Sequence, residues 1–162
     1  INEGSSVGVF ICNKKNLLKK IFYLRDNKEI IIERYIPGKE IQAAIMGNKK
    51  LGAIELKPKR KFYDYKAKYD ANAKTEHIMP AEISKANYLK VMNISLKAHK
   101  LLKCKGTTRS DFRFYKNKFY LLELNTQPGM TSLSLVPEIA KFNNISFFNL
   151  IKWMISDASI RR

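Results

Sequence analysis

The sequence predicts an α+β (α/β) fold in which helices flank a mainly antiparallel sheet. Two pairs of strand-like runs support this prediction, because each pair is typical of a hairpin. Residues 40–46 and 50–56 flank a Gly-Asn turn, and residues 112–114 and 119–124 flank Asn117. A segment with helical spacing of apolar residues follows each hairpin, which indicates a mixed domain.

Three segments have apolar residues at helical spacing, over residues 16–25, 84–102 and 146–156. The short apolar run at residues 30–32 predicts a buried strand. A further short helix is predicted near Pro137, since proline suits the first turn of a helix.

The two longer helices have predicted core faces, and the first of them has a predicted N-cap. Ser84 is a good N-cap residue for the helix that follows it. The face that this helix is expected to bury consists of Val91, Ile94, Ala98 and Leu101. His99 lies beside that face and is interpreted as structural or solvent-facing. The last helix is expected to bury Phe147, Leu150, Ile151 and Met154.

The domain organisation is predicted from one link that contains Pro and Gly and from one long segment whose apolar residues have no regular spacing. The link contains Pro37 and Gly38, so we expect a lobe boundary there, with one lobe over residues 1–34 and another over residues 35–162. Residues 57–74 mix Lys, Arg, Tyr, Phe and Asp. A loop of this length in a compact domain is usually functional or disordered.

The formal charge is +17 and the sequence pI is about 9.9. Such a balance permits binding to nucleic acid, but the lysines are scattered, which favours a solvated surface. No apolar run approaches the roughly 18 residues of a membrane helix, and no signal peptide opens the chain. Cys12 and Cys104 lack metal-type spacing, so we expect buried free thiols in a reducing cytosol.

Oxygen donors gather around the second hairpin. Glu123 and Asn125 share a face because strand side chains alternate. If the turn is centred on Asn117, Asp111 faces Glu123 and Arg109 faces Asn125. Carboxylate and amide oxygens suit Mg²⁺, which also shares phosphate oxygens. The alternative is a cross-strand salt bridge on an exposed sheet face.

These residues belong to a longer pattern that resembles the D-alanine–D-alanine ligase family of the ATP-grasp superfamily. Its most specific pieces are FYDYKAKY at residues 62–69 and ELNTQPGMTSLSLVP at residues 123–137. The other matching pieces lie at residues 3–8, 33–36 with 38 and 40, 80–81, and 104–106 with 109 and 111. The resemblance covers nearly the whole chain and implies an ATP-grasp fold, with a C-terminal lobe and part of the central lobe.

The resemblance implies a role for each matching residue. It implies that two Mg²⁺ ions, or Mn²⁺, are held by Asp111, Glu123 and Asn125. The nucleotide would be held by Glu33, Arg34, Tyr35, Ile36, Glu40 and Lys68. The tetrahedral intermediate would be stabilised by Arg109 and the Gly129 N–H, and the second D-alanine carboxylate by Ser134 and the Leu135 N–H. Tyr69, on a mobile lid over residues 57–74, would close over the site together with Ser5.

The implied reaction joins two D-alanine molecules with ATP, through an acyl phosphate, for peptidoglycan synthesis in the cytoplasm. The implied partners are these small molecules and a second copy of the full-length enzyme, with no nucleic acid and no membrane. Other ATP-grasp ligases, making D-alanine–D-lactate or D-alanine–D-serine, are the alternative within the superfamily. A basic binding module, with residues 57–74 stacking on bases, is the alternative outside it.

Several features depart from the family pattern. The N-terminal domain and its catalytic Glu are absent, and the first residue is Ile1, so we expect a fragment that is inactive alone. An expression fragment, a proteolytic product and a decayed gene product all remain open. Ser110 and Arg113 occupy positions where the resemblance implies apolar residues. Ser110 is expected on the core face and Arg113 on the metal-facing side.

Overall fold

The computed structural model describes residues 8–27, 29–58, 75–131 and 133–158. By their internal contacts the residues divide into two compact units. Unit 1 combines residues 1–36 with 58–75, and unit 2 combines residues 37–57 with 76–162.

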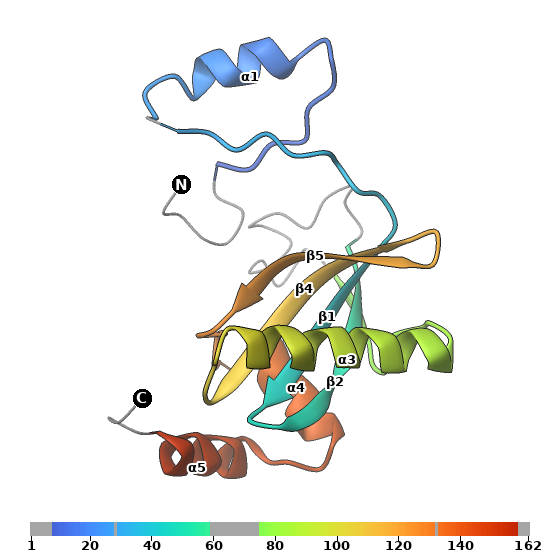
Figure 1. Ribbon diagram of the computed structural model, residues 1–162, viewed down its shortest axis with the longest axis vertical. Coiled ribbons are helices and arrows are strands. Elements are labelled where there is room, and N and C mark those ends of the chain that lie inside the picture. The colour runs from blue at the N-terminus through green and yellow to red at the C-terminus, as the bar shows by residue number, and fades with distance from the viewer. Residues whose placement is uncertain (1–7, 28, 59–74, 132, 159–162) are drawn as a thin grey trace. The chain divides into compact units, whose positions relative to one another are not determined.

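Unit 2 is built on a five-stranded antiparallel sheet (Figure 1). The strands are β1 (Lys39–Met46), β2 (Lys49–Lys57), β3 (Glu76–Ile78), β4 (Thr107–Tyr115) and β5 (Lys118–Asn125). Their order across the sheet is β3-β2-β1-β4-β5. Each predicted hairpin is therefore present, and the pairing of β1 with β4 joins the two hairpins into one sheet. The predicted mainly antiparallel α+β fold is confirmed.

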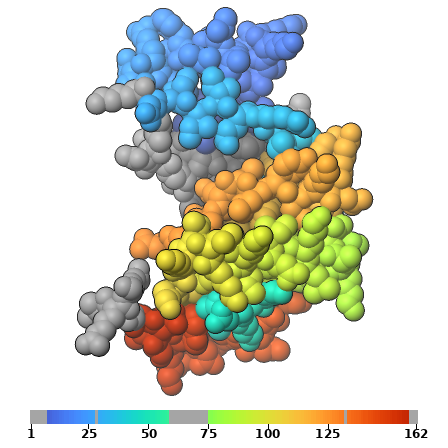
Figure 2. All heavy atoms as spheres, in the orientation of Figure 1, coloured from blue at the N-terminus to red at the C-terminus, as the bar shows by residue number. Residues whose placement is uncertain are grey.

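Helix α3 (Lys85–Leu101) covers one face of this sheet, while α4 (Leu135–Phe142) lies behind it and packs against β2 (Figure 1). Helix α5 (Phe147–Asp157) packs against α4. In the space-filling view the β4–β5 segment is visible beside α3, whereas β1 and β2 show mainly near their turn (Figure 2). The core beneath α3 contains Ile41, Ala43, Ile45, Ala53, Ala81, Val91, Met92 and Phe112.

The predicted helix cap at Ser84 is present, but two predicted core residues are exposed. Ser84 accepts a hydrogen bond from the Asn87 N–H, as expected of an N-cap. Leu101 is 70% exposed because it ends α3, beyond the last turn that contacts the sheet. Phe147 is likewise exposed at the first position of α5, whereas Leu150, one turn later, is fully buried.

His99 is a structural residue. It is buried, and its Nδ1 lies 2.9 Å from the Thr108 hydroxyl of β4. Burial lowers its pKa below the ordinary value of 6.5, although Asp157 opposes this effect. The ring therefore ties α3 to β4 in its neutral form.

Within the described residues, unit 1 contains one helix, α1 (Leu17–Tyr23), and no residue of this helix is buried. The strand predicted at residues 30–32 is wrong: this run is extended but unpaired within the described ranges, and Ile31 is 74% exposed. An apolar run becomes a strand only when another strand supplies hydrogen bonds. Cys12 is a free thiol, and so is Cys104 of unit 2, but both are half-buried rather than buried.

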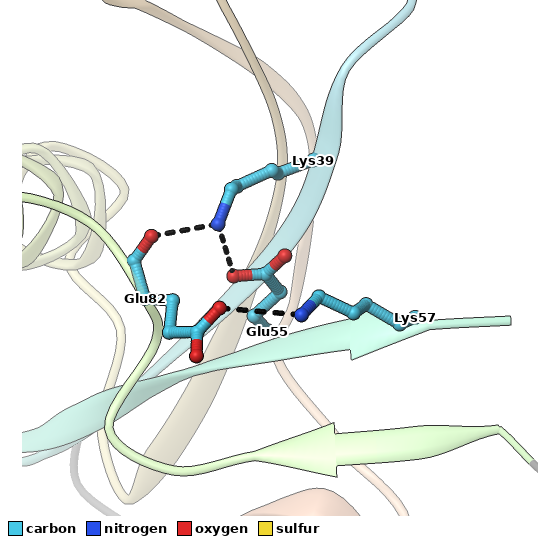
Figure 3. A network of polar contacts seen from close by, with 4 residues as sticks. All are labelled: Lys39, Glu55, Lys57 and Glu82. Carbon is cyan, nitrogen blue, oxygen red and sulfur yellow. Dashed lines mark hydrogen bonds and ion pairs between the residues drawn. The ribbon is translucent and has the colours of Figure 1, made fainter.

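A polar network anchors the start of β1 on the α3 side of the sheet (Figure 3). The Lys39 ammonium donates to the buried Glu55 carboxylate at 2.8 Å and to the Glu82 carbonyl oxygen at 2.7 Å. Lys57 donates to the Glu82 carboxylate at 3.2 Å. Lys39 immediately precedes Glu40, so this network fixes the backbone from which Glu40 projects to the opposite face.

Among the described helices, none has the length and apolar character needed to cross a membrane.

Candidate functional site

The face of the sheet opposite α3 carries the charged residues of the candidate site. On β4 this face presents Arg109, Asp111 and Arg113, because side chains alternate along a strand. Across from them on β1 lie Ala44, Gln42 and Glu40 respectively. The intervening residues of both strands, including Ile41 and Phe112, point into the core beneath α3.

The predicted pairing of the second hairpin is confirmed for the four residues of the candidate site. Asp111 is the Cα partner of Glu123, and Arg109 is the partner of Asn125. The predicted turn centre is half a residue off, however, because Tyr115 pairs with Lys118.

A β-bulge restores the expected pairs. The turn has two residues, Lys116 and Asn117, with φ values of 48° and 58°, as a tight hairpin turn requires. Phe112 pairs with Leu121, and the next pair is Asp111 with Glu123, so Leu122 is the extra residue. Regular pairing of the same chain would move Glu123 and Asn125 to the core face.

The four side chains form two short contacts within this cluster. The Arg109 guanidinium donates two hydrogen bonds to the Asp111 carboxylate, from Nε to Oδ1 at 2.8 Å and from Nη2 to Oδ2 at 2.9 Å. The Asn125 amide donates to Glu123 Oε1 at 3.1 Å. The predicted alternative, a salt bridge across strands on an exposed face, is wrong, because this pair lies within β4 and Asp111 is 7% exposed.

Two carboxylates oppose each other in this cluster. Burial raises the pKa of Asp111 above its ordinary value, the Arg109 guanidinium lowers it, and the neighbouring Glu123 raises it again. The net direction is upward. Like charges placed directly opposite on paired strands destabilise a sheet, so this arrangement favours a cation that both acids share.

The donor set is compatible with Mg²⁺ only when the amide is included. Within the described ranges, no three acidic, His or Cys side chains gather around one point. Asp111, Glu123 and Asn125 together bring two carboxylates and one amide oxygen to neighbouring strand positions. These are hard oxygen ligands of the kind that Mg²⁺ prefers.

Glu40 lies on the same face, and its partner Arg113 is an ion-pairing residue that sequence reasoning did not connect with it. Arg113 Nη2 lies 3.5 Å from Glu40 Oε2. This contact depends on pairing β1 with β4, which are far apart in the sequence. The sequence also did not indicate Gln42, which lies on β1 between Glu40 and Ala44 on this face. Gln42 is buried, and its Oε1 has no hydrogen-bond partner within the described part of the chain.

The turn after β5 places Gly129 against Ser134. A Cβ at position 129 would lie 2.9 Å from Ser134 Oγ, so any larger residue requires the Ser134 side chain to shift. The Ser134 hydroxyl accepts from the Thr131 N–H at 2.9 Å and stands directly before α4. Leu135 is buried as the first residue of that helix.

The remaining predicted site residues lie either outside the described residues or in unit 1. Ser5, Lys68 and Tyr69 lie outside the described residues, as does nearly all of the lid predicted over residues 57–74. Glu33, Arg34, Tyr35 and Ile36 belong to unit 1, where they form an extended segment that is exposed except at Ile36.

The chain is similar to D-alanine–D-alanine ligases in sequence. The family model described as "D-ala D-ala ligase C-terminus" matches residues 1–156. The "D-alanine--D-alanine ligase" of Pelagibacter ubique is 62% identical over 162 residues, which are 100% of this chain and 53% of that protein. That of Paramagnetospirillum magneticum is 42% identical over 98% of this chain and 53% of its own length. The chain spans about half the length of these curated relatives.

Solved structures show the same fold. The D-alanine–D-alanine ligase from Bacillus anthracis superposes with a TM-score of 0.79 at 35% identity, covering 95% of this chain and 51% of that one. The VanG D-Ala:D-Ser ligase from Enterococcus faecalis gives a TM-score of 0.79 at 28% identity, over 94% of this chain and 46% of that one. With the family model matching nearly every residue, the chain belongs to the D-alanine–D-alanine ligase family, as its C-terminal, ATP-grasp portion.

Proposed function

We propose that this chain supplies the nucleotide- and metal-binding half of a D-alanine–D-alanine ligase. The observation that carries the proposal is the cluster of Asp111, Glu123 and Asn125 on one sheet face, with Arg109 gripping Asp111. Family membership supports it, because relatives named D-alanine–D-alanine ligase align over the full chain. In this proposal residues 1–34 are part of a central lobe and residues 35–162 are the C-terminal lobe.

We propose that Asp111, Glu123 and Asn125 would hold two Mg²⁺ ions, and that Mn²⁺ could replace them. The donor chemistry fits, since two opposed acids with one guanidinium favour a further cation. Bound Mg²⁺ would neutralise charge on the phosphoryl group during transfer. Arg109, which is fixed by Asp111, would direct its positive charge toward the same group.

The nucleotide is proposed to bind along this face and the segment before β1. Glu40 would accept hydrogen bonds from the ribose hydroxyls. The backbone of residues 34–36 would read the adenine, with Glu33 beside it. Lys68 would reach the phosphates from the lid, and Tyr69 and Ser5 would close the site against water.

The proposed reaction has two steps. A D-alanine carboxylate oxygen attacks the γ-phosphorus of ATP, and ADP leaves. The amine of a second D-alanine then attacks the acyl carbon, and phosphate leaves as the peptide bond forms. The Gly129 N–H and Arg109 would stabilise the developing oxyanion, while Ser134 and the Leu135 N–H would hold the second carboxylate. The close packing of Gly129 on Ser134 supports this pairing of roles.

The identity of the second substrate is a separate part of the proposal. D-alanine is the first choice because the sequence relatives are D-alanine–D-alanine ligases. The likeness to a D-Ala:D-Ser ligase favours D-serine as the second candidate. ADP release by a full-length version, assayed with D-alanine, D-serine and D-lactate in turn, distinguishes them.

Calorimetry with Mg·ATP on the 162-residue chain tests the binding half of the proposal. We expect binding that depends on Mg²⁺ and weakens at least about tenfold in Glu123→Gln, since a charged ligand is lost. Glu82→Gln is the matched control, because this exposed glutamate pairs with Lys57 on the other face of the sheet. Binding that is equal in both variants, or independent of Mg²⁺, would contradict the metal site.

The same preparation tests the binding-module alternative. A basic nucleic-acid module predicts no Mg·ATP binding, together with nucleic-acid affinity that falls steeply with salt. The chain alone is predicted to form no dipeptide from ATP and D-alanine, and any dipeptide formed would contradict that prediction. Dimerisation and a cytoplasmic location of the full-length enzyme stay proposals from the family.

A further inference from the structure

Arg113 places a charged side chain on the sheet face that carries the candidate site. It follows Asp111 by one alternation on β4, so the two side chains share that face. Its Cα partner on β1 is Glu40, and the two side chains are 11% and 12% exposed. Charged side chains are buried to this extent only where they are paired, so the contacts of Arg113 indicate which groups it stabilises.

The two arms of the Arg113 guanidinium contact two points on β1 and its approach. Nη2 lies 3.5 Å from Glu40 Oε2, and Nη1 donates to the Gly38 carbonyl oxygen at 3.3 Å. One planar group therefore links the Glu40 carboxylate to the backbone two residues before it. Lysine carries the same charge but cannot span two acceptors in fixed geometry.

The position of Glu40 relative to the acidic cluster suits one nucleotide. Asp111 and Arg113 are two residues apart on a strand, which is about 7 Å. A ribose at Glu40 and phosphates near Asp111 would then lie on one face, within the length of a single nucleoside triphosphate. All of these residues belong to unit 2.

We infer that Arg113 is a positioning residue for the nucleotide ribose, an inference that rests on the proposed function of Glu40. A glutamate side chain has several rotamers, and a ligand that must select one of them binds more weakly. Arg113 restricts Glu40 before the nucleotide arrives. It acts on recognition of the ribose hydroxyls and leaves phosphate recognition to the Asp111 cluster.

The test compares Mg·ATP with Mg·2′,3′-dideoxy-ATP, which lacks both hydroxyls that Glu40 would bind. The chain is expected to prefer ATP by about tenfold or more. Arg113→Met should weaken ATP binding about fivefold to tenfold and leave dideoxy-ATP binding unchanged, so the preference collapses. Arg113→Lys should give an intermediate preference.

Two further variants separate positioning from general effects. Lys118→Met removes the same charge from an exposed position on β5 and should keep the parent preference. In a Glu40→Gln background, Arg113→Met should cause no further loss, because the two residues act through one contact. If circular dichroism shows that Arg113→Met is unfolded, Arg113→Lys carries the test, and its preference must fall below that of the parent.

An unchanged preference in Arg113→Met or Arg113→Lys would overturn the role of Arg113 while leaving the Mg·ATP site intact. Failure of the parent chain to bind Mg·ATP would overturn the proposed function itself, and this inference with it.

Discussion

Replacing Lys39 by methionine tests how the start of β1 is held. The substitution keeps most of the aliphatic stem but removes the ammonium that bonds Glu55 and the Glu82 carbonyl oxygen (Figure 3). The Glu55 side chain is 2% exposed and would lose the cation that pairs with it. Its carboxylate is too deeply buried for water to replace the lost partner.

The expected loss follows from the burial of the two partners. Breaking a fully buried ion pair by removing one partner costs about 3–5 kcal/mol. The Lys39 side chain is 36% exposed, so part of its interaction is already screened, and we expect a loss of about 2–3 kcal/mol in the free energy of unfolding.

Lys57→Met is the matched control. Lys57 pairs with Glu82, and the two side chains are 44% and 63% exposed, so both are hydrated without their partner. This variant should unfold at the same urea concentration as the parent. A double variant, Lys39→Met with Glu55→Gln, should recover more than half of the loss because no buried charge remains.

Urea unfolding is the assay, followed by far-UV circular dichroism and by the fluorescence of the single tryptophan, Trp153. Coincidence of the two curves establishes a two-state transition. A Lys39→Met variant within about 0.5 kcal/mol of the parent would refute the reasoning. So would an equal loss in Lys57→Met.

Three further substitutions have expected outcomes. Ser110→Ala should raise the free energy of unfolding by about 1 kcal/mol, because the buried Ser110 hydroxyl has no partner within the described residues; a less stable variant would contradict this. His99 has a lowered pKa, so the folded state loses stability as pH falls below 6.5 toward the folded-state pKa, by at most about 1.4 kcal/mol per pH unit. His99→Gln should flatten that slope in urea titrations between pH 7 and 5, and an unchanged slope would contradict the assignment. Gly129→Ala should cost about 1 kcal/mol by displacing Ser134, measured as a lower midpoint in the same titrations, and a midpoint equal to the parent's would show that the turn adapts.

The pairing of the acidic hairpin could be predicted from the sequence because both strands are local. Alternation alone puts Asp111 and Arg109 on one face, and a turn near Asn117 selects their partners. The prediction assumed a turn centred on one residue and no bulge. The chain has a two-residue turn and a bulge at Leu122, and these two departures cancel at Glu123.

The contacts of Glu40 could not be predicted, since they depend on which strands become neighbours. The pairing of β1 with β4 joins segments separated by β2, β3 and α3, and no local pattern encodes it. Burial was mispredicted for a similar reason. Residues 30–32 form an apolar run and Leu101 has helical spacing, but such patterns indicate which residues a segment can bury, not what is available to cover them.

The bulge at Leu122 also bears on how length can vary in this hairpin. Removing Leu122 would leave Leu121 opposite Phe112 and Glu123 opposite Asp111, because only the unpaired residue is lost. A chain one residue shorter at this point therefore keeps Glu123 opposite Asp111 and Asn125 opposite Arg109. One residue added between Glu123 and Asn125 instead turns the amide to the core face. We therefore expect a deletion at Leu122 to be tolerated and an insertion between Glu123 and Asn125 to disrupt the ligand pairs.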